Sequence, residues 1–164
     1  MEWYRRDKEM ERGTLVIDAS VAVKWFNTEE YSDIADKLKN RHVRGEIVLV
    51  TPVLLLFEVA NALRYNPDFE SEDVEDAIKD LLDLQIKLFM PEEWMSDAVK
   101  IAYTYGTTIY DASYVALSLY LRTIIYTADE NFLRKVSNLN EWKGSIHRSL
   151  FHLTNKGSIH RSVF

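Results

Sequence analysis

The sequence predicts an α/β fold in which a parallel β-sheet is flanked by α-helices on both faces. Three short apolar runs, residues 14–17, 47–50 and 123–127, have the length and the β-branched content of buried strands. Segments with apolar residues at helical spacing lie between them, and such alternation is typical of a parallel sheet covered by helices. Ligands of these sheets bind beyond the carboxyl ends of the strands, so a functional site is expected there.

The helices are predicted from their apolar periodicity and their end signals. Thr51 is expected to cap a helix that has Pro52 in its first turn and ends at Asn66-Pro67. Gly106 is expected to close another. The remaining helices are predicted at about residues 29–42, 71–84, 91–105, 111–122 and 129–136.

Composition suits one globular domain. The chain has 164 residues and is 47% hydrophobic, which is enough for a single core. It has no cysteine, which excludes disulfides, thiolate zinc sites and a cysteine nucleophile. No run of about 18 apolar residues and no signal-peptide core is present, so we expect a cytoplasmic protein without membrane attachment.

The ends of the chain differ from its body. All acidic residues precede residue 142, so the net charge of −6 divides into −10 on residues 1–141 and +4 on the rest. Lys-Gly-Ser-Ile-His-Arg-Ser occurs at 143–149 and again at 156–162. A local duplication, a cloning or reading-frame artefact, and a hairpin turning at 155–157 all remain open. We therefore expect an N-terminal extension at 1–13, one domain at 14–142 and a basic duplicated tail at 143–164.

Three aspartates lie where this fold places its sites. Asp18 and Asp129 follow predicted strands, and Asp111 lies near a predicted helix start. Each could equally serve as a helix N-cap, because aspartate is a preferred capping residue. Taken singly, capping is the favoured interpretation for each.

Glu58 is harder to explain as a surface residue. It lies within a predicted helix, and Leu54, Leu55 and Ala62 share its face. A buried carboxylate requires a cation, hydrogen bonds or protonation. The alternative is that Glu58 reaches outward or pairs with Arg64.

Together the four acids suggest an all-oxygen site for Mg²⁺ or Mn²⁺. A metal pair held by carboxylates could lower the pKa of a bound water, orient it towards a phosphodiester and neutralise charge on the leaving oxygen. The histidines offer no convincing ligand set, since three lie in the tail and His42 is expected at the surface. Lys24, Lys37, Lys39, Arg41 and Arg134 are candidate RNA contacts on charge alone.

Four motifs occur in an order that resembles the VapC-type toxins of the PIN-domain family. They are Val-Ile-Asp-Ala-Ser-Val at 16–21, Glu-Val-Ala-Asn-Ala-Leu at 58–63, Tyr-Asp-Ala-Ser-Tyr-Val-Ala-Leu at 110–117 and Thr-Ala-Asp-Glu-Asn-Phe at 127–132. The resemblance covers roughly residues 14–136. It departs at both ends, where an extension precedes the first strand and the duplicated tail replaces a simple final strand.

The resemblance implies a PIN-like fold and a Mg²⁺- or Mn²⁺-dependent endoribonuclease. Asp18, Glu58, Asp111 and Asp129 would be the catalytic and metal-binding residues. Asp18 and Asp111 would be the principal metal ligands, with Glu58 and Asp129 completing the acidic pocket. Ser20, Thr127 and Asn131 would support these ligands. The resemblance further implies a structured RNA substrate such as transfer or ribosomal RNA, a homodimer, and a cognate VapB-like antitoxin.

Three other functions fit these residues less well. An aspartate-based phosphatase would need a second aspartate at position 20, which is serine. Nucleotide-cofactor chemistry lacks a glycine-rich loop after the first strand. A PIN-like scaffold that binds RNA or protein without cutting it would have little use for four carboxylates beside a polyanion.

Overall fold

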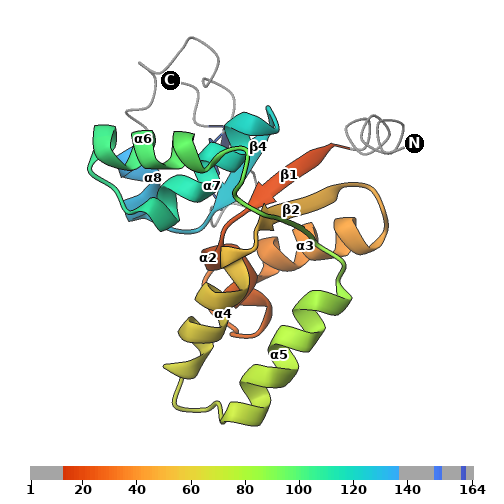
Figure 1. The fold of residues 1–164 in the computed structure, drawn as a ribbon. Helices are drawn as coiled ribbons and strands as arrows, with labels where there is room; N and C mark the ends of the chain where they lie inside the picture. The colour runs from red at the N-terminus through yellow and green to blue at the C-terminus, as the bar shows by residue number, and fades with distance from the viewer. Residues whose placement is uncertain (1–12, 137–149, 153–159, 162–164) are drawn as a thin grey trace.

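A computed structural model describes residues 13–136, 150–152 and 160–161 (Figure 1). Strands and helices alternate along most of this part of the chain. In chain order the elements are β1 (Thr14–Ile17), α2 (Ala19–Ala22), the 3₁₀ helix η1 (Val23–Trp25), α3 (Ser32–Val43), β2 (Val48–Pro52), α4 (Leu54–Arg64), α5 (Ser71–Asp83), β3 (Lys87–Phe89), α6 (Met95–Tyr105), α7 (Ile109–Tyr120), β4 (Ile124–Thr127), α8 (Glu130–Val136), β5 (Leu150–His152) and β6 (His160–Arg161).

The strands form one sheet in the order β3-β2-β1-β4-β5-β6, parallel except for the pairing of β5 with β6. The predicted α/β class with a parallel sheet is confirmed. In the register of β1 with β4, Ile17 lies opposite Tyr126, and the Asp18 N–H donates to the Tyr126 carbonyl at 3.3 Å. The two strands therefore end side by side, which brings the residues that follow them together.

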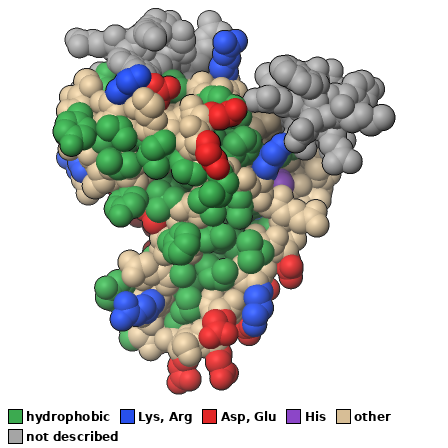
Figure 2. Space-filling view, viewed as in Figure 1, with side chains coloured by type: hydrophobic (Ala, Val, Ile, Leu, Met, Phe, Trp, Pro, Cys, Tyr) green, Lys and Arg blue, Asp and Glu red, His purple; other side chains and the backbone are tan. Residues whose placement is uncertain are grey.

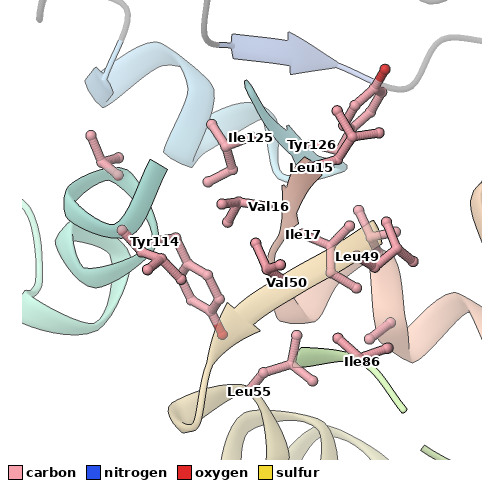
Figure 3. Packing of buried hydrophobic residues seen from close by; sticks show 14 of the residues in the cluster. Leu15, Val16, Ile17, Leu49, Val50, Leu55, Ile86, Tyr114, Ile125 and Tyr126 are labelled. Carbon is pink, nitrogen blue, oxygen red and sulfur yellow. The ribbon is translucent and has the colours of Figure 1, made fainter. Parts of the chain in front are cut away.

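Both faces of the sheet are covered, and successive side chains of β1 point to opposite faces. Figure 3 shows Val16, Val50 and Ile125 on the side of Tyr114 from α7, whereas Ile17 and Leu49 point the other way. α7 packs against β1, β2 and β4 and also against α6, and these contacts together account for the burial of every residue from 112 to 118. In Figure 1, α6 and α7 lie on one side of the strands and α3 on the other.

The predicted helix start at Thr51-Pro52 is wrong. Both residues belong to β2 and pair with Leu88 and Phe89 of β3, a strand that the sequence did not predict. The Thr51 hydroxyl donates to the Ile17 carbonyl at 3.0 Å instead of capping a helix. Pairing with a strand 37 residues further along the chain overrides the local capping signal, and α4 begins only at Leu54.

The tail contributes two strands to the same sheet. Leu150–His152 pairs with β4, and His160–Arg161 pairs antiparallel with β5, so the sheet extends past the expected domain boundary at residue 142. This pairing favours the hairpin among the interpretations of the tail. The expected turn at 155–157, most of both repeat copies and residues 1–12 lie outside the described residues.

His42 joins α3 to its neighbours. Its ring nitrogens lie 2.9 Å from the Leu84 carbonyl oxygen and 3.2 Å from the Leu49 amide nitrogen, so it has a structural position and is only partly exposed. Within the described ranges, no helix is both long and apolar enough to cross a membrane.

Candidate functional site

A cleft of about 370 Å³ opens where β1 and β4 end. All four carboxylates predicted from the sequence line it, although they come from four separate parts of the chain. The side chains around it are Asp18, Ala19, Ser20, Val23, Lys24, Glu29, Glu58, Ala62, Asp111, Tyr114, Ala128, Asp129 and Phe132.

Asp18 is the most buried of these acids, with 7% of its surface exposed. It is the N-cap of α2, and its Oδ1 accepts hydrogen bonds from the Ser20 hydroxyl at 2.6 Å and the Val21 N–H at 3.2 Å. Burial raises the pKa of Asp18 to about 6, although these hydrogen bonds oppose the shift, and repulsion from Asp129 adds to it. Asp18 therefore caps α2 and also lines the cleft.

Ser20 and Thr127 connect Asp18 to the end of β4. The Ser20 hydroxyl accepts from the Ala128 N–H at 2.8 Å and lies 3.5 Å from the Thr127 hydroxyl. The Thr127 hydroxyl in turn accepts from the Asp129 N–H at 3.0 Å. The two hydroxyl groups thus link the Asp18 carboxylate to the backbone at Ala128 and Asp129.

Asp129 is exposed and caps α8, with its Oδ1 accepting from the Asn131 and Phe132 N–H groups at 2.8 and 3.0 Å. Only the backbone of Asn131 takes part. Its side chain accepts from Arg134 at 2.5 Å and lines a separate depression with Tyr105 and Lys135. The expected supporting role of the Asn131 side chain is therefore not seen in this arrangement.

Glu58 belongs to the cleft wall rather than to a core face of α4. It is partly buried, Leu55 below it is buried, and Ala62 is exposed at the cleft. Its partner is the Tyr114 hydroxyl, which donates to Glu58 Oε2, and not Arg64, which lies over the Tyr65 ring. Burial raises the pKa of Glu58, the Tyr114 hydrogen bond opposes this, and repulsion from Asp111 reinforces it.

Asp111 is in the first turn of α7, but it does not cap that helix. The cap is Thr108, whose hydroxyl accepts from the Asp111 N–H at 3.0 Å. The Asp111 Oδ2 accepts from the Thr107 hydroxyl at 3.1 Å. Because Thr108 caps the helix, the Asp111 carboxylate is not needed as the cap. It is partly buried and lines the cleft.

The donor set fits a hard divalent cation by its chemistry, because all four candidates are carboxylates and the pairs Asp18–Asp129 and Glu58–Asp111 repel each other. Within the described residues, however, no three His, Asp or Glu side chains form a group tight enough to hold one ion. The four carboxylates therefore line one cleft without closing into a single compact ligand cluster. Mg²⁺ commonly uses one or two carboxylates and completes its shell with water, which suits two separated pairs.

Two polar residues of the cleft, Tyr114 and Glu29, were not predicted from the sequence. Tyr114 follows Asp111 by three positions on one helix, and that spacing places both on the same face, so helical periodicity was a usable signal. Glu29 reaches the cleft from a loop and has no such signal. Lys24 was a candidate on charge alone, and the structure places it in the cleft wall.

Comparisons with known proteins agree with this architecture. The family model described as PIN domain matches residues 15–138. The chain is similar to Ribonuclease VapC3 of Pyrobaculum aerophilum, with 29% identity over 126 residues, 74% of this chain and 93% of that protein. It also resembles the crystal structure of PAE2754 from Pyrobaculum aerophilum, with a TM-score of 0.56, 22% identity, and coverage of 76% of this chain and 80% of that one. The latter likeness concerns the fold alone.

Replacing Asp18 by asparagine should stabilise the metal-free protein at neutral pH. The folded-state pKa of about 6 lies above the ordinary value of 3.8, so the folded chain loses stability as the pH rises through this interval and Asp18 ionises. The difference corresponds to about 3 kcal/mol at most. Both proteins would be unfolded with urea in the presence of chelator. The free energy of unfolding should be larger for Asp18→Asn than for the wild type at pH 7, and this difference should vanish below about pH 4. An equal gain at both pH values would contradict this account.

Replacing Tyr114 by phenylalanine should raise the pKa of Glu58 further, because the hydroxyl that stabilises the carboxylate is removed. Loss of this hydrogen bond should also cost about 1 kcal/mol of stability. Carbon-13 NMR titration of the Glu58 carboxyl measures the first effect. Tyr103→Phe, an exposed change on α6, is the matched control and should leave the pKa unaltered. A Glu58 pKa that stays the same in Tyr114→Phe would refute the proposed pairing.

Proposed function

Because the chain belongs to the PIN-domain family, we propose that it is a metal-dependent endoribonuclease of the VapC type, acting in the cytoplasm as the toxin of a toxin–antitoxin pair. Its similarity to a curated VapC ribonuclease over most of both chains supports this assignment. The observation that carries the proposal is the convergence of Asp18, Glu58, Asp111 and Asp129 on one cleft at the carboxyl edge of the sheet.

The carboxylates divide into two pairs that would hold Mg²⁺ or Mn²⁺. Asp18 with Asp129 and Glu58 with Asp111 are the pairs whose mutual repulsion a cation would relieve. When bound, such an ion supplies Lewis acidity towards a phosphodiester and polarises water for attack. A buried Asp18 with a pKa of about 6 would release its residual proton as the cation binds.

The remaining side chains of the cleft orient these acids. Ser20 fixes the Asp18 carboxylate through a 2.6 Å hydrogen bond, and Tyr114 does the same for Glu58 from the opposite helix. Preorganised carboxylates need not rearrange when substrate arrives, which lowers the cost of reaching a reactive geometry.

The proposed substrate is structured RNA, such as transfer or ribosomal RNA. A cation bound in the cleft would reduce the repulsion between the acidic body of the chain and a phosphate backbone. A cognate VapB-like antitoxin is the proposed inhibitor, as the name of the VapC relative suggests. The alternative, a PIN-like scaffold that binds RNA or protein without cutting, leaves the supported carboxylates without a use.

We further propose that the protein forms a homodimer through α6 and the start of α7. Met95, Val99 and Tyr103 recur every four residues on α6 and are 39%, 37% and 85% exposed. Ile109 and Tyr110 of α7 are also exposed. Figure 2 shows hydrophobic side chains in a band across this face of the molecule. Contiguous apolar surface of this kind marks interaction sites in soluble proteins.

Substitution of the carboxylates should abolish RNA cleavage. Purified wild type, Asp18→Asn and Asp111→Asn would be incubated with structured RNA in Mg²⁺ or Mn²⁺, with and without chelator. Cleavage should require metal and fall at least about a hundredfold in both variants, because each removes a charge that would bind the cation. Asp97→Asn is the matched control, since Asp97 is paired with Lys100 on the surface of α6.

The cleavage test has a clear negative outcome. Circular dichroism should show that all proteins are folded, so that lost activity reflects the site. Asp111→Asn cutting at the wild-type rate would overturn the assignment of Asp111. A folded wild type that neither cuts nor gains thermal stability with Mg²⁺ or Mn²⁺ would favour the scaffold.

Tyr103→Asp should weaken the homodimer at least about tenfold, because it places a charge at the most exposed aromatic residue of the α6 face. Light scattering coupled to size exclusion, over a range of protein concentrations, measures the mass. Val43→Asp alters an equally apolar exposed residue on α3 and should leave the mass unchanged. Dissociation caused only by Val43→Asp would place the interface elsewhere.

A further inference from the structure

Lys24 is the cationic side chain in the wall of an otherwise acidic cleft. Five carboxylates line the cleft, from Asp18, Glu29, Glu58, Asp111 and Asp129, and among the described residues that line it Lys24 alone carries a positive charge. The Lys24 side chain is only 10% exposed, so its aliphatic stem is held in place. Its ammonium group lies 5.9 Å from the centre of the Tyr31 ring, which further limits where it can point.

The present partner of Lys24 is Glu29, with 3.1 Å between Nζ and Oε1. The loop that carries Glu29 is anchored. The Glu29 N–H donates to the Ser32 hydroxyl at 3.0 Å, and that hydroxyl donates to the Asn27 carbonyl at 3.0 Å. Asn66 of the α4–α5 connection ties down the Asn27 side chain at 2.9 Å. The Glu29 backbone is thus fixed close to Lys24.

The two ends of this ion pair differ in freedom. The Glu29 side chain is 46% exposed, whereas that of Lys24 is 10% exposed. Glu29 can therefore rotate into water without any backbone change, while the ammonium of Lys24 stays in the cleft. A partly exposed ion pair gains little from its contact and is readily exchanged for another anion.

We propose that Lys24 binds a phosphate of the RNA backbone beside the carboxylate site, and that Glu29 is its resting counter-ion, which the phosphate displaces. This inference rests on the proposed function for its substrate class. A lysine ammonium is a compact cation suited to a phosphate oxygen. Binding would leave Lys24 neutralised in both states, first by Glu29 and then by RNA, so the ammonium is never left uncompensated in the cleft wall.

The competing explanation is that the Lys24–Glu29 pair only holds the loop. The two explanations predict opposite effects of removing the Glu29 charge on the affinity for RNA. If the pair is structural, removing either partner breaks the same contact and should weaken RNA binding to a similar degree. If RNA competes with Glu29, removing Lys24 weakens binding, but removing the Glu29 charge strengthens it.

The test measures the affinity for fluorescein-labelled bulk transfer RNA by anisotropy, at constant Mg²⁺ and varied KCl. Every protein carries Asp111→Asn so that RNA is not consumed, and gels confirm that it stays intact. The variants are Lys24→Met, Lys24→Arg, Glu29→Gln and the Lys24→Met/Glu29→Gln double variant. Lys79→Met and Asp76→Asn are matched controls, because these residues form an exposed ion pair of 2.7 Å on α5.

Lys24→Met should weaken binding about tenfold. It should also reduce the slope of log affinity against log salt by about 0.7 to 0.9, the share of one phosphate contact. Lys24→Arg should restore most of the affinity and the slope. Glu29→Gln should tighten binding, and the double variant should resemble Lys24→Met. The control pair should change affinity little.

A Glu29→Gln variant that binds RNA as weakly as Lys24→Met, or a Lys24→Met variant with an unchanged salt slope, would overturn the proposal. If Lys24→Met does not fold, the other two variants still test the proposal. Glu29→Gln should bind RNA more tightly than the wild-type pair, and Lys24→Arg should keep the slope of log affinity against log salt. The readout is binding in the Asp111→Asn background, so binding through Lys24, together with a folded wild type that does not cut RNA in the cleavage test above, would refute the nuclease alone. A folded protein that binds no RNA would refute both.

Discussion

The burial of Asp18 at the end of the central strand is the constraint on which the rest of the site depends. β1 lies between β2 and β4 and delivers this carboxylate to a position where desolvation raises its pKa to about 6. The fold compensates with donors from Ser20 and Val21 and with a backbone hydrogen bond that aligns Asp18 with the end of β4. The parallel register that solves this problem also brings Asp129 to the same edge of the sheet.

Repulsion between neighbouring carboxylates is a second constraint on the cleft. Besides burial, repulsion from Asp129 raises the pKa of Asp18, and repulsion from Asp111 raises the pKa of Glu58. Without a bound cation, these carboxylates therefore destabilise the fold. Natural sites often retain such a cost where binding of a ligand removes it. A cation between the carboxylates would relieve part of this repulsion, and Lys24 would offset the repulsion that the same carboxylates exert on a phosphate of the RNA. The metal proposal and the Lys24 proposal therefore address one electrostatic imbalance.

Sequence reasoning succeeded where local patterns and family motifs agreed. The family prediction is confirmed by the match over residues 15–138, and the parallel α/β fold is confirmed by the strand order. It was wrong at Thr51-Pro52, where a good capping signal lies inside β2 because β3 pairs with it. It also missed β3, whose three residues, Lys87–Phe89, are too short for a periodic signal. Both errors concern the same long-range strand pairing.

By itself, the sequence determined the apolar runs that become β1 and β4 and the identity of the four carboxylates. It could do so because strand burial and residue chemistry are local properties. Only the tertiary structure decided that Glu58 pairs with Tyr114 rather than Arg64, and that Lys24 meets Glu29 inside the cleft. Tyr114 lies 56 residues from Glu58, and their contact depends on how α4 and α7 meet across the end of the sheet. Residue spacing within one helix cannot predict the contact between Glu58 and Tyr114, because the contact results from the packing of both helices on a shared core.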